Sequence, residues 1–455
     1  MDIEEQYDKI YHYCYFKIYD KQLAQDITQE TFLRFYKQEF NFDSSKHLPS
    51  YELKKIANRK LVWIVGMIMI ALSMFLSVSD LVTSSSYYGE TSVSAYQAMK
   101  FNKDNAEKLS GMAIDDTLLR EMQEDCANES KDHTKSQAVT SNNQIAIDIG
   151  VGSDDTESSV LKKYFPIYSY VQQITDDDSL TLSINSNELY AMRKKLISDN
   201  RADQMLNEDE YNDWNSKEIQ ISEPFIYEYT DGWSNVWEYA YTINYMLLLL
   251  LAISLSNVFS IEYYRKTDAI ILCSQYGKKQ LFISKILAGM TFSIASAIIL
   301  FAATLFSSLL VYGTDGFHAA LQLAFPLSSL NISVGGSVLV LLVNLIVISM
   351  VYGSLIMLLS AILKSNVAVM AIPVGIMILT MMVDIPYQFR LASQVYDLLP
   401  TNILNKTELW DDRLICIWGK YFTTFQIAPF LYVVFAVLLV IIGMVIYQRH
   451  QVQAR

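Results

Sequence analysis

Apolar residues gather in six long blocks along the chain. About 20 apolar residues in a helix cross a bilayer core, and runs such as YMLLLLLAISLSNVF and FLYVVFAVLLVIIGMVIY have no polar face. A buried helix of a soluble protein explains any one block but not the set. The pattern therefore predicts six transmembrane helices, at Leu61–Thr83, Tyr241–Ile261, Ile286–Tyr312, Ser337–Leu363, Val367–Val383 and Ile427–Tyr447. The fifth block is short and contains Pro373.

Composition agrees with an integral membrane protein. The 455 residues are 52% hydrophobic and only 18% charged, with a mean hydropathy of +0.19. The first block lies too far from the N-terminus, and is too long, for a signal peptide.

Lysine and arginine residues predict the orientation. They cluster on one side of the membrane if the six spans alternate, and that side is then cytoplasmic. Both termini, including the tail 448–455, are expected inside. The residues concerned are Lys54, Lys55, Arg59 and Lys60, then Arg265, Lys266, Lys278, Lys279 and Lys285, then Lys364, and finally Arg449, His450 and Arg455.

The largest predicted outer segment covers residues 84–237. It has 28 Asp and Glu against 13 Lys and Arg, a net charge of −15, whereas the whole chain has −13. Such a segment is either a solvated surface or a site for cations or cationic peptides. We expect a small α-rich domain with helices in NAEKLSGMAIDDTLLREMQED and SNELYAMRKKLISDN. Cys126 and Cys416 both fall outside, either as a pair or as two lone cysteines.

The chain lacks the common signatures of catalysis and metal binding. It has no Walker A motif, no HExxH and no CxxC, and no ionisable residue lies in the middle of a predicted span. Ion-coupled transporters usually need buried ionisable groups of that kind. We therefore expect a passive permease that binds neither cofactor nor metal, and no ATPase site on this chain. Asn257 and Asn344 are polar exceptions within the spans, where they would tie helices together or line a path.

The stretch between the second and third spans, residues 262–285, contains a short apolar segment, AIILCSQY. Thr267 or Asp268 can begin a helix there and Gly277 can end it, so a short helix under the membrane is expected. This helix either merely joins two spans or is a coupling helix that contacts a soluble protein which drives the movement. The stretch resembles ABC exporter permeases of the type-two family at Phe259, Glu262, Lys266, Thr267, Gly277, Lys278 and Lys285. The segment EPFIYEYTDGWSNVWEY is similar to the Firmicute members.

This resemblance, over about residues 51–455, implies further features. It implies an amphipathic elbow helix at 47–60, interfacial helices in the outer loop 384–426, and a homodimer or a second permease. It also implies separate ATPase subunits that carry the ATP, and a substrate that is an antimicrobial peptide, a lipid or an ion. The ATPase-coupling residues would be Glu262, Arg265, Lys266, Thr267, Asp268, Gly277, Lys278 and Lys285.

The N-terminal stretch AQDITQETFLRFY resembles region two of extracytoplasmic-function sigma factors, within residues 6–61. That resemblance implies a polymerase-facing set of Asp26, Gln29, Glu30 and Phe32. The sequence departs from the family after Leu61, where it enters the membrane, and no second helix-turn-helix or basic face follows. We therefore expect a truncated sigma-like segment at 1–46 and no nucleic-acid binding.

Together these patterns predict an all-α membrane protein with six transmembrane helices, cytoplasmic termini and an α-rich extracytoplasmic domain. The expected function is the permease subunit of an ATP-driven ABC exporter in the bacterial cytoplasmic membrane. One alternative is a membrane-tethered regulator whose sigma-like head binds RNA polymerase or an anti-sigma protein. Another is a receptor-like scaffold without transport.

Overall fold

The fold is taken from a computed structural model of the chain. It describes residues 3–18, 21–22, 24–26, 28–29, 32, 44–83, 85–88, 91–125, 159–175, 183–264, 279–363, 365–383 and 385–449.

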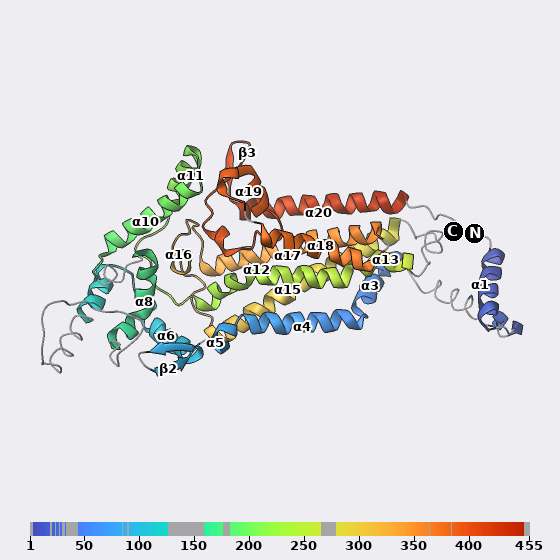
Figure 1. Ribbon diagram of the computed structural model, residues 1–455, viewed down its shortest axis with the longest axis horizontal. Helices are drawn as coiled ribbons and strands as arrows, with labels where there is room; N and C mark the ends of the chain where they lie inside the picture. The colour runs from blue at the N-terminus through green and yellow to red at the C-terminus, as the bar shows by residue number, and fades with distance from the viewer. Residues whose placement is uncertain are drawn as a thin grey trace.

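A bundle of long apolar helices forms the body of the protein (Figure 1). Within the described residues, four helical stretches are long and apolar enough to cross a membrane: Asp231–Ile261, Lys279–Tyr312, Val334–Ile362 and Thr424–Gln448. The bent pair formed by α3 (Ser44–Ala57) and α4 (Lys60–Leu76) makes a fifth candidate, with 69° between its two parts. The chain is thus a multi-pass, mostly helical membrane protein.

The predicted fifth span corresponds to α18 (Asn366–Met382). Its 17 residues rise about 25 Å, which is less than a typical hydrocarbon core. A complete membrane crossing by α18, and with it the total of six spans, therefore remains a prediction.

Several helices extend beyond the apolar blocks. Helix α12 (Asp231–Leu255) begins ten residues before Tyr241, and α15 (Lys279–Tyr312) begins seven before Ile286. The helices gain these extra turns because capping and packing determine where a helix begins and ends, and hydropathy alone does not.

Helix α17 (Val334–Ile362) lies at the centre of the bundle, packed against α12, α15 and α20 (Thr424–Arg449). Small residues let α15 and α17 approach closely. A Cβ atom on Gly289 would overlap Met357, and one on Gly353 would overlap the Ser293 hydroxyl group. These two glycines therefore set the spacing of the two helices.

The helices α3 and α13 (Asn257–Tyr264) lie at one end of the bundle in Figure 1. A layer of smaller elements covers the other end: α6 (Ala95–Leu109), a helix at 116–125, α8 (Ser159–Thr175), α10 (Ser186–Asp203) and α11 (Glu208–Glu218). Short helices α5 (Ser79–Thr83), α16 (Leu321–Ala324), η1 (Tyr387–Phe389), α19 (Arg390–Asp397) and η2 (Lys406–Leu409) connect the rest.

Both helices at the tip of this outer layer begin with a capping box. Asn185 caps α10 together with Glu188, and Asn207 caps α11 together with Glu210. Each asparagine accepts the amide of the glutamate, whose carboxylate returns to the asparagine amide. The helix predicted from SNELYAMRKKLISDN is therefore well defined at its start.

Two short antiparallel hairpins, which the sequence analysis did not predict, accompany the helices. Strands β1 (Ser85–Tyr88) and β2 (Thr91–Ser94) pair Ser85 with Ser94, and β3 (Ile415–Ile417) and β4 (Lys420–Phe422) pair Ile415 with Phe422. Trp418 and Gly419 join β3 to β4, and both have positive φ, as a type I′ turn requires. The turn and the flanking aromatic and β-branched residues favour a hairpin over a helix.

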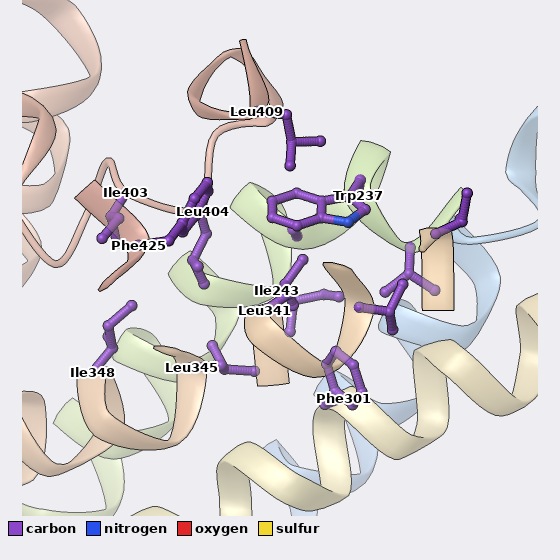
Figure 2. Packing of buried hydrophobic residues seen from close by; sticks show 14 of the residues in the cluster. Trp237, Ile243, Phe301, Leu341, Leu345, Ile348, Ile403, Leu404, Leu409 and Phe425 are labelled. Atoms are coloured by element: carbon purple, nitrogen blue, oxygen red, sulfur yellow. The ribbon is translucent and has the colours of Figure 1, made fainter. Parts of the chain in front are cut away.

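The buried core is continuous from the bundle into the loop before α20. Figure 2 shows Ile403 and Leu404 of that loop close to Phe425, near the side chains of α12 and α17. Trp237 of α12 packs edge-on against Phe425, with 5.7 Å between ring centroids. This part of the loop 385–423 thus belongs to the membrane bundle.

Candidate functional site

The polypeptide breaks its helical path where α12 meets α13, at Ser256. The Ser360 hydroxyl of α17 donates to the Ser256 carbonyl at 2.7 Å and accepts the amides of Phe259 and Ser260, both at 3.1 Å. A hydroxyl has one proton and two lone pairs, so these three bonds use its full capacity. Insertion of a side chain into the backbone ladder is a recognised cause of a helix kink.

Two cations bind carbonyl groups on either side of this break. Arg59, between α3 and α4, donates to the Ser254 carbonyl at 2.7 Å. Lys285 of α15 donates to the Val258 carbonyl at 2.8 Å, and its ammonium group lies 4.8 Å from the centroid of the Phe259 ring. Charged donors make stronger hydrogen bonds than neutral ones, so both contacts hold the junction firmly.

The remaining helices reach the same junction through aromatic and amide groups. Phe259 is fully buried, and its ring centroid lies 5.4 Å from those of Phe282 in α15 and Tyr447 in α20. The Ser260 hydroxyl lies against the Asn366 amide at the start of α18. The α12–α13 junction therefore contacts α15, α17, α18 and α20.

The predicted coupling residues fall into two groups. Glu262 lies in α13, and Lys285 lies inside α15 at 1% exposure. Such a buried ammonium group acts on the junction through the Val258 carbonyl and the Phe259 ring that it contacts. The others lie outside the described residues: Arg265, Lys266, Thr267, Asp268, Gly277 and Lys278.

The described residues of the sigma-like segment differ in exposure, as on the two faces of a helix. Asp26 and Gln29 are exposed, whereas Thr28 is buried and donates to the Ala24 carbonyl at 2.7 Å. The Phe32 ring lies 5.6 Å from that of Tyr7 in α1 (Ile3–Ile18). Glu30 lies outside the described residues. The resemblance to a sigma factor stays a prediction.

Comparison with known families decides the class of the protein. The family model described as ABC-2 family transporter protein matches residues 50–452, which is most of the chain. The chain belongs to this family. No curated protein and no solved structure matches it. As an ABC-2 permease, it is the membrane component of an ABC transporter, whose partner is an ATPase.

The sequence analysis found only part of the α12–α13 junction. Arg59 was visible as one of the basic residues before the first span, but its partner was not. Ser360 and Asn366 carry no local signal, because serine and asparagine occur at many positions near helix ends. Asn344 donates within α17, to the Val340 carbonyl at 2.9 Å, so this bond does not join two helices.

A different asparagine joins α12 to the outer loop. Asn244 donates to the Pro400 carbonyl at 2.7 Å, and the Tyr352 hydroxyl of α17 donates to the same oxygen at 2.8 Å. Tyr432 of α20 donates to the Leu398 carbonyl at 2.8 Å. Three long helices of the permease thus hold residues 398–400 by polar contacts.

Buried arginines fasten the outer layer of the permease to the loops. Arg193 of α10 is fully buried and donates to Glu218 at 2.6 Å and to the Pro326 carbonyl at 2.9 Å. Arg201 lies about two turns further along α10. It donates to Asp412 at 2.6 Å and to Ser329 at 2.8 Å. Helix α10 therefore bridges the loop before α17 and the loop before α20.

Burial changes the acid–base behaviour of this bridge. It raises the pKa of Asp412 to about 6, although the neighbouring Arg201 guanidinium acts in the opposite direction. Desolvation disfavours the charged carboxylate more than the ion pair recovers. The Asp412 carboxyl group is therefore sensitive to mildly acidic pH.

Proposed function

We propose that this chain is the permease of an ATP-driven exporter in the bacterial cell membrane, and that α13 carries the movement of a separate ATPase into the bundle. The observation that supports this is the junction itself. The carbonyls of Ser254, Ser256 and Val258 are each bound by a different part of the bundle, so a displacement of α13 acts on several helices at once.

The segment 265–278, which follows α13 along the chain, would form the contact with the ATPase. The basic residues of this segment in the sequence, and the basic positions before α4, support a cytoplasmic location for this end of the chain's spans by the positive-inside rule. The outer layer of α6, α8, α10 and α11 would then face the cell exterior. ATP would bind to the partner subunit, and two permease chains, identical or different, would assemble with two ATPases.

The substrate class follows only from the family resemblance, as an antimicrobial peptide, a lipid or an ion. The described spans carry no Asp, Glu, Lys, Arg or His at their middle, which supports a passive conduit. The energy for its conformational change would then come from the partner ATPase. Membrane-embedded ion-coupled carriers instead use ionisable groups at mid-span.

Copurification from membranes tests the proposal. The full chain should recover an ABC ATPase, identified by mass spectrometry, and the double variant Lys266→Glu, Lys278→Glu should lose it. Lys285→Met should keep the ATPase bound but uncouple ATP hydrolysis from the permease, because it removes the bond to Val258 without changing the contact surface. Recovery of RNA polymerase in place of an ATPase would favour the membrane-tethered regulator.

A further inference from the structure

A cavity opens at the end of the bundle opposite α13, between the end of α18, Tyr241 of α12 and the loop that precedes α20. Its volume is about 630 Å³, and its lining includes Asp397 of α19, Glu408 of η2, and Asp411. One oxygen atom from each of these three carboxyl groups lies within 4.8 Å of the others. The three residues come from separate turns of the loop, so the fold brings them together.

Two oxygen atoms in this cavity are buried without a partner. Glu408 is 8% exposed and Asn402 is 6% exposed. Neither Glu408 Oε2 nor Asn402 Oδ1 has a hydrogen-bond partner among the residues that the structure describes. A buried oxygen left unpaired destabilises the fold, and more so when it is charged. The unpaired, uncharged oxygen of Asn402, which lines the same cavity as the carboxylates, is therefore a second and separate indication of a ligand site.

The charges around the cavity are not balanced. Arg413 donates to Asp397 at 2.5 Å and to Asp411, and supplies one positive charge against three carboxylates. Burial, followed by the charges of Asp411 and Asp397, raises the pKa of Glu408 well above its ordinary value. With all three carboxylates ionised, the cluster carries a net charge of −2, which one divalent cation would neutralise.

We propose that Asp397, Glu408, Asp411 and the Asn402 side-chain oxygen form a binding site for a divalent cation, with Ca²⁺ as the best fit. All four ligands are oxygen atoms, which hard cations prefer. Calcium binds oxygen at about 2.3–2.6 Å, so ligands on opposite sides of one ion are separated by about 4.6–5.2 Å. The carboxylate oxygens lie within 4.8 Å of one another, which is compatible with that separation. Ca²⁺ accepts six to eight oxygen ligands in flexible geometry, whereas Mg²⁺ usually keeps several waters and one or two carboxylates.

The ion would join three parts of the outer loop. Asp397 ends α19, Glu408 lies in η2, and Asp411 precedes β3. Asp412, the next residue, binds Arg201 of α10. Cation binding would therefore stiffen the loop beside the contact between the outer layer and the bundle. This site is independent of the ATPase contact proposed above.

Titration of the purified full chain in detergent with Ca²⁺ tests the site. We expect saturable binding with a Kd of about 10⁻⁴ to 10⁻³ M, as in extracellular calcium modules. Tb³⁺ luminescence gives a second readout, because Tyr387 and Tyr396 line the cavity and can sensitise the ion. Ca²⁺ should displace Tb³⁺ and raise the melting temperature more than Mg²⁺ does.

Glu408→Gln should weaken Ca²⁺ binding at least about tenfold, since it removes a charged ligand but keeps the shape. Glu208→Gln is the matched control, because Glu208 is exposed at the start of α11 and should leave binding unchanged. If Glu408→Gln does not fold, Asn402→Ala provides the second variant, with weaker Ca²⁺ binding expected.

Three results would overturn the proposal. The first is the absence of saturable Ca²⁺ binding by the unmodified chain at millimolar concentrations. The second is equal binding by the unmodified chain and by the ligand variant that folds. The third is stabilisation by acidification alone, with no effect of Ca²⁺, which would show that a proton on Glu408 fills the role.

Discussion

The hydroxyl oxygen of Ser360 in α17 lies 2.7 Å from the carbonyl oxygen of Ser256, at the residue where α12 gives way to α13. The two residues are 104 positions apart in sequence. Their contact ties the break between α12 and α13 to the central helix α17. A movement of α17 must therefore change the position of the α12–α13 junction, and the reverse also holds.

Removal of the Ser360 hydroxyl should weaken this control. In Ser360→Ala the amides of Phe259 and Ser260 lose their acceptor, and the α12–α13 stretch should straighten toward an uninterrupted helix. We expect ATPase binding to persist and permease-dependent ATP turnover to change severalfold, measured on the purified complex. Ser349→Ala is the control, because the Ser349 hydroxyl donates only within α17, to Ile346 at 2.6 Å. Equal effects of both variants would contradict the role given to Ser360.

Close packing of α15 on α17 should make Gly353 intolerant of a side chain. Gly353→Ala would push a Cβ atom into the Ser293 hydroxyl, and overpacking of this kind costs about 1–3 kcal/mol. Gly375→Ala should be neutral or slightly stabilising, since nothing lies within 4 Å of its Cβ position. Thermal unfolding in detergent measures both. A Gly353 variant as stable as the parent chain would show that α15 and α17 can separate freely.

The buried pair of Arg201 and Asp412 should matter far more than an exposed pair of the same layer. Arg201→Met leaves the Asp412 carboxylate buried without its partner, which should cost about 3–5 kcal/mol. Lys194→Met removes an exposed partner of Glu223 and should cost at most about 1 kcal/mol. Limited proteolysis of the outer layer and thermal unfolding would separate the two. Similar losses would contradict the bridging role of α10.

Acidification should stabilise the folded state through Asp412. The folded pKa of Asp412 is about 6, above the value of about 3.9 for an unfolded aspartate, so the folded state binds the proton more tightly. The contribution of this group to stability therefore rises as the pH falls from 7 toward 4, by about 2–3 kcal/mol. The test is the difference in pH dependence between the unmodified chain and Asp412→Asn. A parallel pH dependence in the two proteins would contradict the raised pKa.

Deletion of residues 1–46 should leave the permease assembled. The family match begins at residue 50, and Arg59, which binds the Ser254 carbonyl, is retained. We expect the shortened chain to reach the membrane and to recover the ATPase. Loss of ATPase recovery on deletion, with membrane insertion intact, would assign the N-terminal segment a part in the complex.

The sequence predicted the bundle better than the contacts inside it. The bend between α3 and α4 lies near the predicted elbow, and α10 matches the expected helix, because caps and apolar runs act within a few residues. The hairpin at Trp418 and Gly419 was missed, although a two-residue turn containing glycine is a local signal. The sequence predicted Lys285 as an ATPase-coupling residue, and that role stays a prediction, whereas its burial and its bond to the Val258 carbonyl come only from the structure.

What the sequence alone determined was the class of the protein. Apolar run length and the distribution of lysine and arginine are sums over neighbouring residues, so they require no knowledge of packing. Only the tertiary structure decided that Ser360 reaches Ser256, that Arg59 reaches Ser254, and that three carboxylates meet in the cavity that Asn402 also lines. Those contacts depend on which faces of distant helices and loops are brought together. A hydrogen bond or ion site forms only when its partners lie within a few ångströms of each other, and residues far apart in the chain carry no local record of that distance.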